Sequence, residues 1–264
     1  MLMNAPRYRW MGLLSLGLLM WQCGPNPTGS LEESHPERVP DYITAERYTR
    51  LVIEVDYVEG MKPEGATLQN LVAGLEPLLA KPDGIEVVLD EKLAARGADY
   101  RWSGEELLSL QARTFDLPVD DRTVKMHALF LDGRDARDDS YLGLEWANRN
   151  IAIFKQSIDR SCRTQTKHQF GLVERLCQQA EESIWTHEIG HVIGLVDNGL
   201  PMVTDHVDPD HPHHDADEAC VMYWAFERQK ALDSIRGRLR DDPDSDALGF
   251  GEACRADIAA MQSP

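Results

Sequence analysis

The sequence is constrained most by residues 171–195, GLVERLCQQAEESIWTHEIGHVIGL, which contain no proline and carry a regular apolar stripe. Members of the stripe recur at steps of three and four residues, the spacing that places side chains on one face of an α-helix. The stripe consists of Val173, Leu176, Cys177, Ala180 and Ile184, and it continues into His187 and His191. The pattern predicts a long buried helix whose inward face changes from apolar side chains to imidazoles.

Strand-like and helix-like segments alternate along the chain before this helix. The segments predicted as strands are 50–58, 85–90, 123–132 and 141–155, the last broken by turn residues near 147–150. The segments predicted as helices are 67–80 and 103–115 and, after the long helix, parts of 219–239 and 252–261. Ser103 and Glu106 form a capping-box pattern at the start of one of them. This order is typical of an α/β fold of the α+β type, in which helices cover a mixed sheet.

The N-terminus has the pattern of an export signal. Arg7 and Arg9 precede the apolar run WMGLLSLGLLMW, residues 10–21, which is too short to span a bilayer. Cys23 closely follows the run, and residues 1–23 together resemble a bacterial lipoprotein signal, in which the cysteine is lipidated. We therefore expect an exported protein held by a lipid anchor on the outer face of a membrane, in the periplasm or at the cell surface. An ordinary cleaved signal, which gives a secreted protein, or an uncleaved anchor is the alternative.

Composition separates the rest of the chain into two parts. Residues 24–47 are rich in proline, glutamate and serine and are expected to form a flexible tether, which leaves residues 48–264 as one folded domain.

The formal net charge of the whole chain is −18. Such a surface repels nucleic acid, so DNA and RNA are not expected as partners.

The cysteines fit an oxidising compartment. Beyond Cys23 there are four, an even number that suggests two disulfides in an exported chain. Of the three connectivities, proximity in the chain favours Cys162–Cys177 and Cys220–Cys254. A structural zinc cluster is the weaker alternative because the chain has no CxxC pair.

Three residues near the end of the long helix carry a chemical prediction. His187 and His191 are four positions apart, so a helix stacks both imidazoles toward one metal ion. Glu188 is offset from the pair, where its carboxylate can take a proton from a water at the metal without being a ligand. Zinc lowers the pKa of such a water toward about 7, which makes hydroxide available at neutral pH. A pair of ordinary hydrogen-bonded histidines is the alternative.

The residues after His191 extend the motif. Gly194 predicts a sharp, left-handed end to the helix. Asp197 follows where the reversed chain returns toward the metal, and its carboxylate is predicted as the third zinc ligand. The string His187-Glu188-x-x-His191-x-x-Gly194-x-x-Asp197 resembles the metzincin signature, whose last position is usually histidine, and the aspartate is similar to the snapalysin variant.

The metzincin resemblance implies a fold and an activity. It implies a zincin-like twisted mixed sheet with an antiparallel edge strand, a long active-site helix, a Met-turn and C-terminal helices, within residues 48–264. Met222, in the segment CVMYW, is the implied Met-turn residue, a floor beneath the zinc and not a ligand. The implied activity is that of a zinc endopeptidase, with a protein or peptide substrate pairing with the edge strand, which is expected at residues 150–154. The motif match itself covers residues 187–224.

A histidine-rich loop follows the motif. The segment TDHVDPDHPHHD, residues 204–215, contains four aspartates and four histidines, His206, His211, His213 and His214. His206 is the alternative third ligand if Asp197 does not reach the metal. The cluster is also a candidate site for a second ion, calcium through oxygens or zinc through imidazoles, and otherwise it is a solvated loop.

Two other functions stay open. The chain could be a different zincin with a downstream glutamate, Glu218 or Glu227, as third ligand. It could also be a surface lipoprotein that binds metal on a metzincin scaffold without turnover. Glu188 argues against the second alternative, since a structural zinc site needs no general base.

Overall fold

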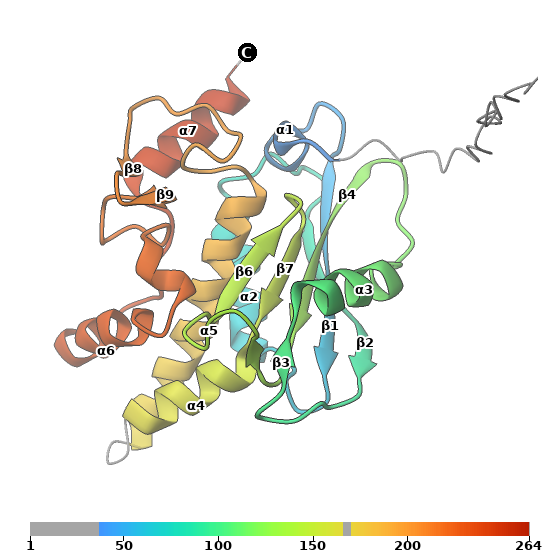
Figure 1. Cartoon of the computed structure of the whole chain (residues 1–264). Helices are drawn as coiled ribbons and strands as arrows, with labels where there is room; N and C mark the ends of the chain where they lie inside the picture. Colours follow the sequence, from blue (N-terminus) through green and yellow to red (C-terminus); the bar gives the residue numbers. More distant parts are fainter. Residues whose placement is uncertain (1–36, 166–169, 264) are drawn as a thin grey trace, which may run out of the picture. The chain divides into compact units, whose positions relative to one another are not determined.

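A five-stranded mixed sheet runs through the computed structural model, which describes residues 37–165 and 170–263 (Figure 1). In sheet order its strands are β2 (Ile85–Leu93), β1 (Arg50–Val58), β4 (Thr123–Phe130), β7 (Asn150–Ile153) and β6 (Gly143–Trp146). The first four are parallel, and β6 is antiparallel to β7. The predicted α/β (α+β) fold with an antiparallel edge strand is therefore confirmed.

The identity of the edge strand is corrected. Residues 150–154 were expected at the edge, but β7 lies between β4 and β6, and β6 forms the edge. The two strands form a hairpin whose turn contains Ala147 and Asn148, both in the left-handed region with φ of 59° and 51°. Because this turn reverses the chain sharply, β7 returns beside β6 and inserts between it and β4.

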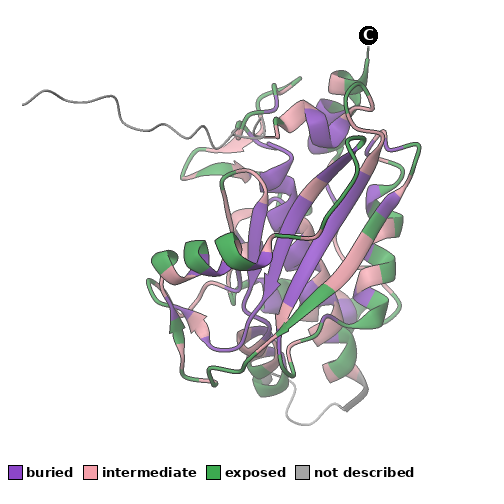
Figure 2. Cartoon of the chain, turned by 90° about the vertical axis from the view of Figure 1, so that its right-hand side faces the viewer, coloured by how far each residue is buried: buried purple, intermediate pink, exposed green. Residues whose placement is uncertain are grey.

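Helices cover both faces of the sheet. On one face lie α2 (Gly65–Leu75) and the long α5 (Phe170–Val192), and on the other lies α3 (Gly104–Thr114) (Figure 1). Helix α4 (Lys155–Gln165), which was not anticipated, packs against α5. The central strands are buried along most of their length, whereas β2 at the far edge is partly exposed (Figure 2).

Alternation along the strands explains this layering. In β4, Met126, Ala128 and Phe130 belong to the core under α5. Leu129, between the last two, belongs to a smaller core with α3. Because successive strand side chains point to opposite faces, the apolar run 128–130 of β4 is suited to burial under helices on both sides.

The C-terminal part surrounds the end of α5. It contains a short hairpin of β8 (Val207–Asp208) and β9 (His211–Asp215), the 3₁₀ helix η1 (Trp224–Glu227), and helices α6 (Ala231–Asp241) and α7 (Glu252–Gln262). A two-stranded sheet of β3 (Arg101–Trp102) and β5 (Arg134–Asp135) lies elsewhere in the fold. The predicted capping box of Ser103 and Glu106 is confirmed at the start of α3.

The folded unit begins earlier than the expected boundary at residue 48. It starts at Glu37, and α1 (Val39–Ile43) buries Tyr42 and Ile43 fully. The end of the expected tether therefore packs into the hydrophobic core through these two side chains. The signal over residues 1–23, Cys23 and residues 24–36 lie outside the described residues. Within residues 37–165 and 170–263, no helix combines the length and apolar character needed to cross a membrane.

One of the two expected disulfides is present. Cys162 and Cys177 are bonded and join α4 to α5, so this prediction is confirmed. The predicted Cys220–Cys254 disulfide is wrong: both residues are thiols, with sulfur atoms 3.7 Å apart. Each sulfur has other partners, since Cys220 Sγ accepts from the backbone N–H of Gly251 (3.1 Å) and Cys254 Sγ donates to Asp215 (3.5 Å).

Candidate metal centre

His187 and His191 lie on successive turns at the end of α5 and point to the same place. Their Nε2 atoms are 3.0 Å apart, and both side chains are buried. Two nitrogens bound to one tetrahedral zinc ion at about 2.0–2.1 Å would be about 3.3 Å apart. The pair is therefore spaced as zinc ligands are.

The segment that contains Met222 supports these imidazoles from below. The Nδ1 atom of His187 is 2.7 Å from the carbonyl oxygen of Val221, which leaves Nε2 to face the centre. Met222 is fully buried, and a Cβ on Gly190 would come within 2.2 Å of its sulfur. Gly190 thus lets the helix rest directly on Met222, in the arrangement implied for a Met-turn.

Glu188 points toward the edge strand. Its Oε1 atom is buried and has no hydrogen-bond partner in the described part of the chain. A Cβ on Gly143 of β6 would come within 2.5 Å of that atom, so the edge strand passes directly over the carboxylate. An unpaired buried carboxylate is costly unless a cation or substrate completes it.

The chain turns sharply at Gly194, as predicted. Gly194 has φ of +80°, and a Cβ there would lie 2.9 Å from the backbone nitrogen of Leu200 and 2.7 Å from Val39. Val196 continues the reversal in the left-handed region, with φ of 54°. Asn198 then donates from Nδ2 to the carbonyl oxygen of His191 (3.0 Å), which closes the end of the helix.

The structure does not bring Asp197 into the centre. Its side chain is exposed, while its backbone carbonyl oxygen lies 3.1 Å from Nδ1 of His213. Asp197 itself has φ of 58°, so three left-handed residues within four positions carry the chain past the metal centre before it can return. Asp197 is therefore not among the residues whose ligand atoms converge.

A third imidazole comes from the β8–β9 hairpin. His214 lies with its ring centroid 5.3 Å from that of His187 and 5.1 Å from that of His191. Its Nδ1 is 2.9 Å from the carbonyl oxygen of Pro212, and its buried Nε2 has no hydrogen-bond partner in the described chain. An imidazole fixed through one nitrogen, with the other free, is the usual arrangement of a metal-bound histidine.

Glu227 of η1 completes the group. Ligand atoms of His187, His191, His214 and Glu227 all lie within 4.8 Å of one another. Glu227 Oε2 is 3.7 Å from His214 Nε2, and its Oε1 accepts from Arg228 Nε (3.2 Å). Of the two downstream glutamates considered from the sequence, the structure thus places Glu227 at the centre. Glu218 instead accepts from the Tyr223 hydroxyl (3.2 Å) and is exposed.

His206, the alternative third ligand, lies elsewhere. Its two ring nitrogens are each 2.9 Å from a carboxylate, Nδ1 from Asp215 and Nε2 from Asp257. His206, Asp215 and Cys254 form a second group of potential ligands. His206 is therefore not part of the first centre, and it lies within the segment considered for a second ion.

Burial sets the charge of the centre. It lowers the pKa of His187 to about 4 and the pKa of His191 well below its usual value, so both imidazoles are neutral and can offer lone pairs to a metal. Burial, together with Glu227 and Glu145, raises the pKa of Glu188 well above its usual value. For Glu227, burial raises the pKa, but His214, His187 and Arg228 outweigh it and the net shift is downward. A divalent cation beside Glu188 would favour its ionised form.

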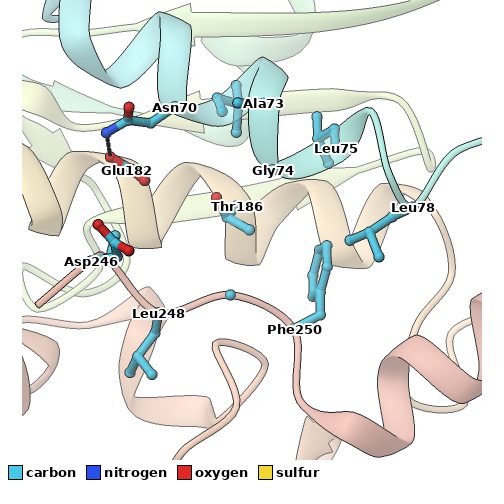
Figure 3. Close-up of a pocket in the computed structure, with 13 residues that line it drawn as sticks. Asn70, Ala73, Gly74, Leu75, Leu78, Glu182, Thr186, Asp246, Leu248 and Phe250 are labelled. Carbon is cyan, nitrogen blue, oxygen red and sulfur yellow. Dashed lines mark hydrogen bonds between the residues drawn. The ribbon is translucent and has the colours of Figure 1, made fainter.

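The centre opens into a cavity of about 250 Å³. Its lining includes Glu188, His191, His214, Glu227 and Tyr141. A cavity of about 380 Å³ between α2, α5 and residues 246–250 is different in kind (Figure 3). There Asn70 donates to Glu182 (2.9 Å), and no imidazole lines the wall. The chemistry is therefore expected at the first cavity.

Part of this centre is predictable from the sequence. Tyr141, Gly143 and Arg228 were missed because nothing near them in the chain resembles a motif. His214 was noted only as one of four loop histidines. Alternation along β9 could have distinguished it, because neighbouring strand residues point to opposite faces. His214 is accordingly half-buried, and His213 is exposed.

Comparisons with known proteins give only distant similarities. No family model and no curated protein matches the chain. Among solved structures, an archaemetzincin from Methanopyrus kandleri is 12% identical, with 81% of this chain and 95% of that chain covered and a TM-score of 0.46. A zinc-dependent peptidase from Methanocorpusculum labreanum is 14% identical, with 78% and 99% covered and a TM-score of 0.47. An archaemetzincin from Archaeoglobus fulgidus, complexed with malonate, is 14% identical, with the same coverage and a TM-score of 0.41.

Proposed function

We propose that this protein is a zinc-dependent endopeptidase. The proposal is carried by one observation: three imidazoles and a carboxylate converge beside a second, buried and unpaired carboxylate. Imidazole nitrogens with a carboxylate oxygen form a donor set suited to zinc. The lone-pair directions fit as well, because the Nδ1 atoms of His187 and His214 are held by backbone carbonyl groups.

His187, His191 and His214 would hold the metal in this proposal, with His214 in the place first assigned to Asp197. When bound, a zinc ion polarises the carbonyl group of a peptide bond and lowers the pKa of water. Glu227 is either a fourth ligand or, through its bonds with Arg228, a carboxylate that orients His214. The two roles predict different zinc affinities for a Glu227→Gln variant.

Glu188 is the proposed general base. Its Oε1 atom takes a proton from the attacking water and then delivers it to the nitrogen of the leaving amine, so that the carboxylate is regenerated. The edge strand keeps this atom buried, since Gly143 lies directly above it. A residue with any side chain at position 143 would occupy the space of the carboxylate.

The proposed substrate is an extended segment of a protein or peptide. Strand β6 is the free edge of the sheet beside the centre, and Leu144 and Glu145 of this strand line the cavity. An extended chain could pair with the backbone of β6 and bring one peptide bond over Glu188.

A catalytically silent metal-binding protein is the second candidate. The observation that favours it is the fourth potential ligand, Glu227, because four protein ligands would close a zinc site. Cleavage of a peptide library by zinc-loaded protein, compared with Glu188→Ala, decides between the two. The endopeptidase proposal requires cleavage by the wild type and a loss of several orders of magnitude in the variant. Equal cleavage by both, or no cleavage by zinc-loaded wild type, would overturn it.

The remaining proposals concern location and a second ion. Export, with a lipid on Cys23, is proposed from the N-terminal residues alone, and mass spectrometry of the mature N-terminus tests it. A second ion near residues 206–215 is proposed at His206, Asp215 and Cys254. A ratio of two zinc ions per chain, reduced to one in His206→Ala, would support it, whereas one ion in both proteins would exclude it.

A further inference from the structure

Tyr141 is fastened beside the metal centre by its backbone. It lies two residues before β6 and forms an isolated antiparallel bridge with Arg228. The next residue, Leu142, donates its backbone N–H to the carbonyl oxygen of Glu227 (2.8 Å). The segment that contains Tyr141 is therefore held against the segment that contains Glu227. The side chain of Tyr141 lines the same cavity as Glu188 and His214.

Arg228 fixes the hydroxyl group of Tyr141. Its Nη2 donates to the Tyr141 oxygen (2.6 Å), while its Nε donates to Glu227 Oε1 (3.2 Å). These two N–H groups lie on one edge of the planar guanidinium, so the hydroxyl and the carboxylate sit side by side. The guanidinium carbon also lies 4.1 Å from the centre of the Tyr141 ring, and Nη1 donates to Asp138 (2.9 Å). Tyr141 is thus fixed through its hydroxyl group, the face of its ring and its backbone.

The direction of these bonds leaves the proton of Tyr141 available. A guanidinium only donates, so the Tyr141 oxygen is the acceptor in its bond with Arg228. Within residues 37–165 and 170–263 the Tyr141 hydroxyl has no acceptor for its own O–H. A hydroxyl that accepts from a cation is polarised and becomes a stronger donor. Tyr223, the other tyrosine near the centre, directs its O–H to Glu218.

We propose that Tyr141 is a catalytic residue that donates a hydrogen bond to the oxygen of the scissile carbonyl group; this inference rests on the proposed peptidase function. As the oxygen of water bonds to the carbonyl carbon, the π electron pair moves onto the carbonyl oxygen, and Glu188 takes the proton of the water. Tyr141 stabilises that developing negative charge and keeps its own proton. The electron pair then returns from the oxygen to re-form the C=O bond. At the same step the C–N bond breaks, and the amine leaves with the proton from Glu188. Preorganised donors of this kind act mainly on the transition state.

The test compares Tyr141→Phe with Tyr223→Phe in the zinc-loaded full chain. Tyr141→Phe keeps the ring over Arg228 and removes only the hydroxyl. We expect kcat to fall about 10²–10³-fold, as for loss of one oxyanion donor, with KM changed little and zinc content unchanged. Tyr223→Phe should retain the wild-type kcat.

Three results would overturn the assignment. Unchanged kcat in Tyr141→Phe would exclude a donor role. Loss of zinc in proportion to activity would show that Tyr141 only holds Glu227 in place. A fall of kcat in Tyr223→Phe, with none in Tyr141→Phe, would assign the role to the other tyrosine. In each of these cases the wild type still shows cleavage that depends on Glu188, so the proposed function stands. A wild type without any cleavage would overturn the proposed function, and the role of Tyr141 with it.

Discussion

The Nδ1 atom of His187 lies 2.7 Å from the carbonyl oxygen of Val221, although the two residues are 34 positions apart in the chain. This contact fixes the ring so that Nε2 faces the centre. Val221 is itself held by the backbone of Gly249, whose carbonyl oxygen accepts from its N–H (3.0 Å). The metal centre therefore depends on three segments being folded together: the end of α5, the Met222 segment and the chain before α7.

The first prediction concerns the third ligand. We expect His214→Ala to lower zinc affinity by at least about 10–100-fold, because it removes an imidazole whose Nε2 faces the other two. We expect Asp197→Ala to bind zinc as the wild type does, because the Asp197 side chain is exposed. Zinc retained against a competing chelator measures both affinities. The reverse result, with loss of zinc only in Asp197→Ala, would restore the assignment made from the sequence.

The second prediction concerns the edge strand. In Gly143→Ala the new methyl group would lie 2.5 Å from Glu188 Oε1 and 2.7 Å from Ile184 Cγ2, so the carboxylate must move. A displacement of about 1 Å in a catalytic group can cost about 10²-fold in rate. We therefore expect a fall in kcat of that order with zinc content unchanged. Steady-state kinetics on the best library peptide, with metal analysis of the same sample, provides the measurement.

Gly74→Ala is the matched control for this experiment. Gly74 lies in α2, and a Cβ there would meet nothing within 4 Å. Its activity should equal that of the wild type. Full activity in Gly143→Ala would mean that Glu188 can occupy another position and still work.

Local spacing explains which parts of the centre could be predicted from the sequence. His187, Glu188 and His191 share one helix, so the helical repeat alone determines their relation. The turn at Gly194 is equally local, because only glycine enters the left-handed region there without strain. Asp197 was assigned by spacing along the chain, and three left-handed residues within four positions move it outward.

The parts that were missed depend on pairing between distant segments. His214 reaches the centre through the register of the β8–β9 hairpin, and Tyr141 through its bridge with Arg228. The order of β6 and β7 in the sheet likewise follows from which strand pairs with β4. Such pairings follow from the energetics of the whole fold and leave no periodicity in the sequence.

The third prediction concerns the turn after α5. In Gly194→Ala the residue would keep φ near +80° and meet the backbone nitrogen of Leu200 at 2.9 Å. A left-handed conformation and an overpacked contact together cost about 2–5 kcal/mol. We expect the free energy of unfolding in urea to fall by that amount. Gly237→Ala, in α6 with open space around its Cβ, should instead stabilise by about 0.5–1 kcal/mol. Equal stability of the two variants would contradict a strained turn at Gly194.

The fourth prediction concerns pH and His206. Burial lowers the pKa of His206, but its bonds to Asp257 and Asp215 outweigh burial, and the net shift is upward. The folded state therefore binds a proton more tightly than the unfolded state, whose histidine pKa is about 6.5. This contribution to stability is complete below about pH 6.5 and is lost as pH rises through the higher pKa of the folded state. We expect the difference in unfolding free energy between wild type and His206→Gln to shrink over that range.

Urea unfolding at a series of pH values, from about 6 to about 9, measures this difference, with a chelator present in one series and zinc in the other. In the series with chelator, only the ion pairs of His206 contribute to the difference in unfolding free energy. If that difference stayed flat or rose with pH, the ion pairs would be contradicted. Zinc at this group requires a neutral imidazole, so a second ion would stabilise the protein more as pH rises. Opposite slopes in the two series would therefore show that His206 exchanges its two carboxylate partners for a metal ion. Matching downward slopes would show that it is a half-buried cation that ties Asp215 to Asp257.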